Sequence, residues 1–162
     1  MSSNLDIQQP QPFDIVNQTI LISGNAVAFE GTLTINVSDG HDEFSSFTNV
    51  GSLALKQFQG EITIPDNPAF QLSRLFLRLA DDTGNENGPS VTIPVLFGPK
   101  ILSGYTGYRN YTIEPGDTLT SIAQSEYGNS EFQPIVDANQ HIITNPNLIF
   151  AGQVIRIPRN DT

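Results

Sequence analysis

Two acidic segments are the first places in this sequence where the residue types could do chemistry. They are residues 39–43 and 81–86, and each groups several carboxylates. Because calcium binds carboxylate and carbonyl oxygens, both segments are candidates for a calcium loop. Neither has the spacing of an EF-hand loop. We therefore interpret both as solvated turns and expect no metal site.

The residues that catalysis usually needs are sparse. His41 and His141 are the only histidines, and their separation in the chain does not favour a shared metal site. Ser23 lacks the nucleophile-elbow motif that would indicate a serine hydrolase. The absence of cysteine excludes thiol catalysis and cysteine-based zinc sites. We expect no catalytic residues and no cofactor.

Charge and hydropathy narrow the range of partners. The 162 residues include 17 acidic and seven basic side chains, for a net charge of -10. Nucleic acids and anionic membrane surfaces attract basic proteins, so neither is an expected partner. No apolar run approaches the ~20 residues of a membrane helix. Residues 1–10 contain no basic residue and no apolar core, so they do not form a secretory signal. Either the protein is not exported by that route or its signal lies outside this chain.

The region 13–97 has the pattern of an all-β domain. Apolar and polar residues alternate in several short segments, which is typical of half-buried strands. The alternating segments are 32–38, 61–64, 74–79 and 90–97, and the apolar segments 19–24 and 26–29 complete the set. Turn residues separate them, which predicts a β-sandwich with Pro94 in an edge strand or a bulge. Residues 1–12 are expected to be a flexible lead-in, and residues 98–110, rich in glycine, a linker.

The pattern changes at Tyr111 to a small α+β unit. A short strand at 111–113 precedes a helix, for which Asp117 or Thr118 would be the N-cap and Gly128 the C-terminal signal. A second helix is predicted to start with a capping box of Ser130 and Gln133, to hold Pro134 in its first turn and to end near Asn139. A strand at 154–158 closes a β-α-α-β order.

Residues 111–158 resemble the LysM domain over its whole length. The residues that match are 111–119, Ile122, Ala123, Tyr127, Gly128, Ile135, Ala138, Asn139 and 145–158. Two positions depart from the common pattern: Phe132, where many members have tryptophan, and Ala151, where many have proline. The resemblance implies a βααβ module that binds polymers containing N-acetylglucosamine, either peptidoglycan or chitin-type oligomers.

The LysM resemblance also implies where the glycan would bind. The site would lie between two loops and include Gly116, Asp117, Thr118, Leu119, Asn147, Leu148, Ile149 and Phe150. Each residue also has a structural interpretation, since the first loop suits helix capping and the leucines suit a core. If the second loop is tight, at least one of its three apolar side chains faces outward, and an exposed apolar side chain indicates binding.

The N-terminal half resembles the immunoglobulin-like domain of bacterial spore-germination proteins, the Gmad group. Residues 22–33, 75–79 and 82–95 show the resemblance. It implies a structural or adhesive role outside the cytoplasm and no catalysis.

Together these patterns predict a two-domain, non-enzymatic protein that binds N-acetylglucosamine-containing glycan. The sandwich would be a spacer or would meet a protein partner. The alternative is an assembly component whose LysM-like module makes protein contacts instead of binding the wall. The resemblances imply a cell-envelope or extracytoplasmic location, and a cytoplasmic one stays open because residues 1–10 do not form a secretory signal.

Overall fold

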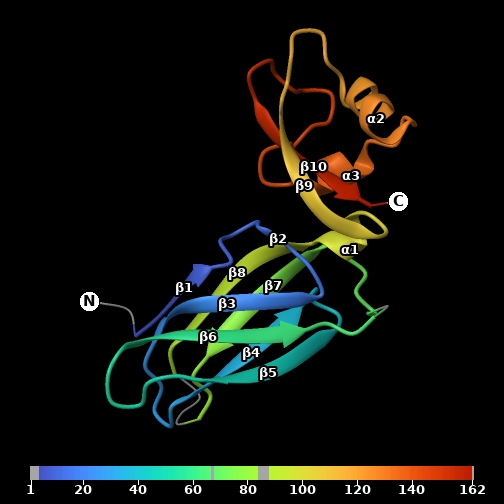
Figure 1. Ribbon diagram of the computed structural model, residues 1–162. Coiled ribbons are helices and arrows are strands. Elements are labelled where there is room, and N and C mark those ends of the chain that lie inside the picture. The colour runs from blue at the N-terminus through green and yellow to red at the C-terminus, as the bar shows by residue number, and fades with distance from the viewer. Residues whose placement is uncertain (1–3, 67, 84–87, 162) are drawn as a thin grey trace. The chain divides into compact units, whose positions relative to one another are not determined.

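The computed structural model describes residues 4–66, 68–83 and 88–161 (Figure 1). The chain divides into two compact units, residues 1–97 and residues 98–162. The N-terminal unit is all-β, and the C-terminal unit combines a small sheet with short helices. This is the fold class that the sequence predicts.

Two sheets make up the N-terminal unit. One has the strand order β1-β3-β6 and the other the order β2-β8-β7-β4-β5. All the strand pairs are antiparallel except that of β2 with β8. The strands are β1 Leu5–Gln9, β2 Ile15–Val16, β3 Thr19–Ala26, β4 Thr32–Ser38, β5 Glu43–Asn49, β6 Lys56–Thr63, β7 Arg74–Ala80 and β8 Ser90–Phe97.

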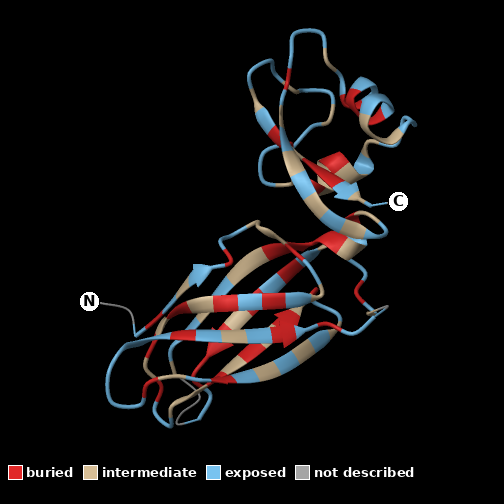
Figure 2. Cartoon of the chain, in the orientation of Figure 1, coloured by how far each residue is buried: buried red, intermediate tan, exposed pale blue. Residues whose placement is uncertain are grey.

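Alternating burial along the strands builds the core of this unit. In β4, Leu33, Ile35 and Val37 are fully buried and the residues between them are not. Figure 2 shows the same alternation of buried and exposed residues along the neighbouring strands. Side chains at every second position of a strand point to one face, so the apolar sets of the two sheets meet. The predicted β-sandwich is therefore confirmed.

Side chains of β5 join the two sheets along one edge. The Ser46 hydroxyl donates to the Glu61 carbonyl of β6 at 3.2 Å, and the Thr48 hydroxyl donates to the Gln59 carbonyl at 3.3 Å. These bonds satisfy carbonyl groups of an edge strand that would otherwise be open to pairing. The sequence pattern does not predict β5, because the polar residues at its centre weaken the alternation.

Three expectations for the N-terminal unit are wrong. Residues 5–9 are not a flexible lead-in, because they pair with β3 and bury Leu5 in the core. The strand expected at 26–29 ends at Ala26, where the chain turns and leaves Phe29 exposed. Finally, Pro94 is not in an edge strand, because β2 pairs with β8. This pairing covers only positions 96 and 97, so β2 needs no backbone N–H from Pro94 and the proline is tolerated.

The first aspartate of each acidic turn, Asp39 or Asp81, is buried, so the expectation of fully solvated turns is wrong. The buried carboxylate of Asp39 accepts hydrogen bonds from the backbone N–H groups of His41, Asp42, Gln71 and Leu72, at 2.6 to 3.3 Å. Burial alone would raise the pKa of Asp39, but these four donors outweigh it and hold the pKa well below its ordinary value.

Asp81 is used in the same way in the second acidic turn. Its carboxylate accepts from the Phe29 N–H at 2.7 Å and from the N–H and hydroxyl of Thr83. Burial would raise its pKa, and these bonds lower the pKa below its ordinary value. Residues 84–86 of this predicted turn lie outside the described residues.

The C-terminal unit is a two-stranded antiparallel sheet packed against short helices. Its elements are α1 Gly98–Ile101, β9 Tyr105–Thr112, α2 Leu119–Tyr127, α3 Gln133–Ala138 and β10 Val154–Asn160. Residues 98–110 are therefore not a linker, since they form α1 and most of β9. The small residue at Gly98 is required there, because a Cβ atom would collide with the Tyr105 ring.

Helix boundaries in this unit follow side-chain and glycine chemistry. The Thr118 hydroxyl accepts from the Ser121 N–H at 3.0 Å and the Ser121 hydroxyl accepts from the Thr118 N–H, which forms a capping box at the start of α2. Gly128, at φ +73°, ends this helix. The capping box predicted for Ser130 and Gln133 is wrong, because α3 starts after Phe132 with no side-chain cap.

Asn139 connects α3 to the β9–β10 sheet through hydrogen bonds of its side chain. Its fully buried amide donates to the carbonyls of Ile135 and Arg156, both at 2.7 Å, and accepts from the Arg156 N–H at 2.8 Å. The two bonds with Arg156 satisfy backbone groups on the unpaired edge of β10, and the third satisfies a carbonyl of α3. Within the described residues, no helix is long and apolar enough to cross a membrane.

Candidate functional site

The two loops of the predicted site lie side by side at one end of the β9–β10 sheet (Figure 1). The Ile113 N–H donates to the Gln153 carbonyl at 2.8 Å, and the Gly152 N–H donates to the Ile113 carbonyl at 2.7 Å. These bonds extend the strand pairing just beyond Thr112 and Val154. The first loop then runs to Thr118, and the second arrives from Asn139, so the structure brings the two predicted segments together.

The first loop is held in shape by Asp117. Its Oδ2 accepts from the Glu114 N–H at 2.8 Å and from the Tyr111 hydroxyl at 2.7 Å. These bonds hold the pKa of Asp117 below its ordinary value, and the bond from Tyr111 raises the pKa of the tyrosine. Asp117 thus stabilises the loop through hydrogen bonds within it, while Thr118 is the N-cap of α2.

Gly116 has a backbone conformation that other residues rarely adopt. Its φ is +91°, and a Cβ atom there would meet no other atom within 4 Å. Glycine is therefore favoured at this position by the backbone conformation and not by a lack of space for a side chain. The side chain of Leu119 lies in the core, so at this position only the backbone is available to a ligand.

The second loop exposes apolar side chains. Leu148 is 60% exposed and Phe150 is 66% exposed, while Ile149 packs against the core between them. A turn at Asn145 sets this arrangement. The Asn145 side-chain Oδ1 accepts a hydrogen bond from the Asn147 N–H at 2.9 Å, and the Asn145 carbonyl accepts one from the Leu148 N–H. Exposed apolar side chains beside polar loop groups are typical of a binding surface.

Val154 belongs to the same end of the unit and was missing from the predicted site. It is 52% exposed and pairs with Thr112 at the start of β10. The alternation of β10 could have indicated it, because Ile155 and Ile157 face the core and Val154 therefore faces away.

The structure offers no metal-binding cluster among the described residues. No group of three or more histidine, aspartate and glutamate side chains comes together there. His141 lies beside Arg156, with 3.2 Å between its Nδ1 and the guanidinium Nη2. Burial and the positive charge of Arg156 both lower the pKa of His141.

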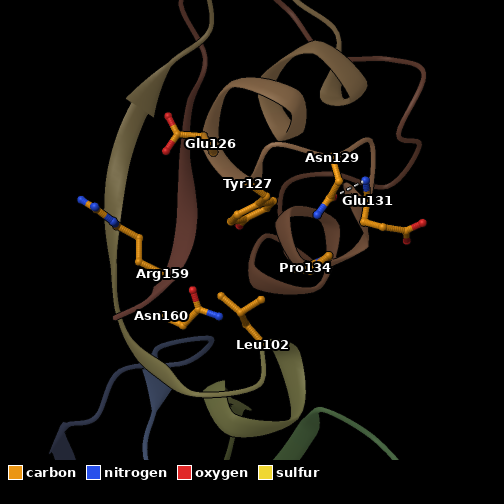
Figure 3. A pocket seen from close by; sticks show the side chains of 8 residues that line it. All are labelled: Leu102, Glu126, Tyr127, Asn129, Glu131, Pro134, Arg159 and Asn160. Atoms are coloured by element: carbon orange, nitrogen blue, oxygen red, sulfur yellow. Dashed lines mark hydrogen bonds between the residues drawn. The ribbon is translucent and has the colours of Figure 1, made fainter. Parts of the chain in front are cut away.

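A polar cavity occupies the other end of the C-terminal unit. It has a volume of about 430 Å³ and lies between the end of β10 and the α2–α3 loop (Figure 3). None of the eight predicted site residues lines it. No sequence pattern indicates this cavity, since its lining comes from three separate stretches of the chain, at 102, 126–134 and 159–160.

Curated proteins similar to this chain match it over a short stretch. The potassium binding protein Kbp of Escherichia coli is 41% identical over 60 residues, which cover 36% of this chain and 40% of Kbp. The secreted LysM effector Mgx1LysM of Zymoseptoria tritici is 44% identical over 48 residues, 30% of this chain and 49% of the effector. An uncharacterized protein of Deinococcus radiodurans is 46% identical over 54 residues, 33% and 21% of the two chains.

The chain thus spans less than half the length of each of these relatives. No solved structure matches it significantly.

Two family models match the chain, one in each unit. The model of the immunoglobulin-like domain of bacterial spore germination, Gmad2, matches residues 4–84, which is half of the chain. The LysM model matches residues 111–158. Both resemblances seen in the sequence are confirmed. The chain therefore belongs to the family of the immunoglobulin-like domain of bacterial spore germination and carries a LysM domain in its C-terminal unit.

Proposed function

We propose that this protein binds N-acetylglucosamine-containing glycan, peptidoglycan or chitin-type oligomers, through the two loops at one end of its LysM domain. The observation that supports this most is the pair of exposed apolar side chains, Leu148 and Phe150, beside the loop of Gly116. Sugar rings and N-acetyl methyl groups present apolar surface that such side chains can cover, and the exposed loop backbone supplies hydrogen-bonding groups.

Neutral contacts must provide the whole of this binding. Residues 111–158 contain one basic residue, Arg156, against five acidic ones. Charge therefore opposes association with an anionic wall and does not select it. One small module with such contacts binds weakly, and several copies on one polymer would strengthen retention.

Both matched domain types are binding domains without catalytic chemistry, and we infer the same for the whole protein. The name of the effector relative, which is secreted, supports a location outside the cytoplasm. Potassium binding is the property of Kbp, which shares only a 60-residue stretch with this chain, and it is not part of the proposal.

A retention assay tests the proposal. The full chain is incubated with insoluble peptidoglycan and with chitin, and the bound fraction is measured for the parent and for the variant Leu148→Ala with Phe150→Ala. We expect retention of the parent and an affinity loss of about 5- to 30-fold in the variant, because truncating two exposed anchors costs on the order of 1–2 kcal/mol.

Phe47→Ala is the matched control. Phe47 is as exposed as Phe150 but lies on β5 of the sandwich, so its truncation is expected to leave retention unchanged. Failure of both matrices to retain the parent would contradict the proposal. Equal retention of parent and loop variant would show that the site is elsewhere.

A second candidate is an assembly role, in which the sandwich meets a protein partner. The observation in favour is an apolar tip formed by Phe29 and Leu53, which are 74% and 98% exposed. Their two turns are joined by a hydrogen bond from the Ala28 N–H to the Gly51 carbonyl at 2.9 Å. Exposed large apolar side chains at one tip are typical of an interaction surface.

The assembly role has its own test. Co-purification from the source organism with the parent and with Phe29→Ala plus Leu53→Ala compares the partners retained. Loss of a stoichiometric partner in the variant supports this role, and an unchanged set contradicts it.

A further inference from the structure

The outer edge of β9 is open to a further strand. β9 and β10 form a two-stranded sheet, so each has one edge that does not face the other (Figure 1). The N–H and the carbonyl of Arg156 both bond to the Asn139 side chain, so they point away from β9. Arg156 pairs with Asn110, and the two residues of an antiparallel pair either bond to each other or both point away. The Asn110 N–H and carbonyl therefore point to the outer edge of β9.

Tyr108 and Thr112 point to the same edge, because the direction of the backbone groups alternates along a strand. Ile113 confirms this alternation, since its N–H and carbonyl bond to the loop that leads into β10. Tyr108, Asn110 and Thr112 thus present their N–H groups and carbonyls outward. Among the residues that the structure describes, none of these backbone groups has a hydrogen-bond partner. Such a row of unpaired groups is a template for another strand.

The other edge strands of the described chain are short, interrupted or occupied. β2 has two residues, β1 is interrupted by a bulge, and β5 faces β6 through two of its hydroxyl groups. The Asn139 side chain and the Tyr127 hydroxyl occupy the edge of β10. Proteins prevent unwanted strand pairing in these ways. β9 has eight residues without proline or lysine, and its one charged side chain, Arg109, is already paired with Glu126.

The composition of β9 indicates what kind of strand fits this edge. Because Arg109 is neutralised by Glu126, β9 offers no free charge that would select a charged peptide. Tyrosine and threonine, which make up most of β9, favour strand pairing with residues of the same kinds. A neutral strand rich in these residues matches the edge best, and β9 itself is such a strand.

We propose that β9 pairs antiparallel with β9 of a second copy of this chain, with Asn110 of the two copies opposite each other. This register pairs all the outward-pointing groups of both strands, in about six hydrogen bonds. It places Tyr108 opposite Thr112, an aromatic and β-branched pair that stabilises sheets. It also places Arg109 opposite Tyr111, and these two side chains already make a cation–π contact within one copy, at 5.4 Å. No like charges lie opposite each other.

The net charge of the chain does not prevent this pairing. Residues 98–162 contain four basic and six acidic side chains, whereas residues 1–97 contain three basic and eleven acidic ones. Most of the net charge of -10 therefore belongs to the other unit. At physiological salt, repulsion between exposed charges is largely screened beyond about 8 Å.

The dimer would contain a four-stranded sheet of the order β10-β9-β9-β10. Because the two β9 strands are antiparallel, the glycan loops of the two copies would lie at opposite ends of this sheet, roughly 26 Å apart along the strands. Two sites in one particle hold one polymer more firmly than a single site does. This consequence rests on the proposed function, whereas the pairing of the strands does not.

Amide hydrogen exchange of the ¹⁵N-labelled full chain, at low and at high protein concentration, tests the pairing. We expect the N–H groups of Tyr108, Asn110 and Thr112 to exchange rapidly in the monomer and at least about tenfold more slowly when the dimer forms. The N–H groups of Arg109 and Tyr111 face β10 and should be protected at both concentrations. Exchange at the outer edge that does not depend on concentration would overturn the inference.

A charge-swap experiment tests the register. Asn110→Lys and Asn110→Asp each place two like charges opposite each other, so each variant is expected to weaken dimerisation about tenfold in sedimentation experiments. An equal mixture of the two variants pairs lysine with aspartate and should recover the parent affinity to within about threefold. Asn49→Lys and Asn49→Asp, at an exposed position of β5, are the matched controls and should leave dimerisation unchanged.

Three sedimentation results would overturn the inference: a parent that stays monomeric at every concentration, equal dimerisation of the Asn110 and Asn49 variants, or no recovery in the mixture. Asn110 is exposed, so its variants are expected to fold, and their amide spectra check this. None of these measurements contains a glycan. A failure here would therefore leave the proposed glycan site standing, and a failure of glycan binding would leave the strand pairing standing.

Discussion

The two units use their polar residues in opposite ways. In the sandwich, the acidic turns that look most chemical are occupied: Asp39 and Asp81 bind backbone N–H groups of their own chain. In the LysM domain, loops of ordinary composition leave Leu148 and Phe150 open to solvent. Residue type alone therefore misleads in both directions, and availability to a ligand decides which residues can bind.

The units also differ in how much core supports them. Buried residues from seven strands form the core of the sandwich, whereas eight buried residues form that of the LysM domain. Because small units bury a smaller share of their surface, the same truncation removes a larger part of their stability.

The largest effect is therefore expected from Ile135→Ala in the LysM domain. Ile135 is fully buried, and such a truncation costs about 2–5 kcal/mol. Urea unfolding followed by the amide signals of each unit should show the LysM domain unfolding at much lower urea, with the sandwich nearly unchanged. Loss of both units together would contradict the separate cores.

Asp39→Asn is expected to have the next largest effect, in the other unit. The variant keeps the shape, but its amide has a single acceptor oxygen, so two of the four hydrogen bonds are lost and the other two lose their charged acceptor, with a cost of about 1–3 kcal/mol at neutral pH. Urea midpoints of the sandwich signals measure it.

The pH dependence of the same variant sharpens the comparison. Because the folded pKa of Asp39 is lowered, its stabilisation is present above the pKa of the unfolded chain and is lost as pH falls below it. The difference between parent and Asp39→Asn should therefore shrink as the solution is acidified from pH 7. A difference that grows on acidification would contradict the assignment.

Thr118→Ala is expected to lower the stability of the LysM domain by about 1 kcal/mol, because it removes the N-cap of α2. Thr118→Ser keeps the hydroxyl and serves as the matched control. Thermal unfolding of the full chain, read on signals of α2, measures the change. Equal midpoints for the alanine and serine variants would mean that the cap contributes nothing.

The smallest expected effect is that of salt on retention by anionic peptidoglycan. Raising salt from low to physiological concentration shortens the screening length to about 8 Å and weakens the repulsion of this acidic chain. Retention should rise modestly. A clear fall with salt would indicate that attraction between charges holds the complex, contrary to the neutral contacts proposed.

Local signals predicted most of the fold. Alternation located β4, β7 and β8, an apolar run located β3, and the helix signals placed the N-cap at Asp117 or Thr118 and the end at Gly128. The errors arose where long-range pairing decides the structure. β1 has a polar sequence and forms because β3 offers it a partner, and β9 continues through a glycine-rich stretch because β10 pairs with it.

The candidate site was predictable as two segments but not as a surface. The resemblance supplied the positions, and only the fold shows that Leu119 faces the core while Phe150 faces solvent. The cavity between Arg159 and Glu131 was beyond sequence reasoning, because its residues are close only after α2, α3 and β10 have packed.

Chemical-shift mapping with a soluble N-acetylglucosamine tetramer tests the central claim most directly. The full ¹⁵N-labelled chain is titrated, and the amide signals of both units are followed together. Our account predicts saturable shifts at residues 115–119 and 147–154, and none in the β5 signals of the sandwich. Shifts confined to the sandwich, or no shifts in the two loops at saturating tetramer, would contradict it.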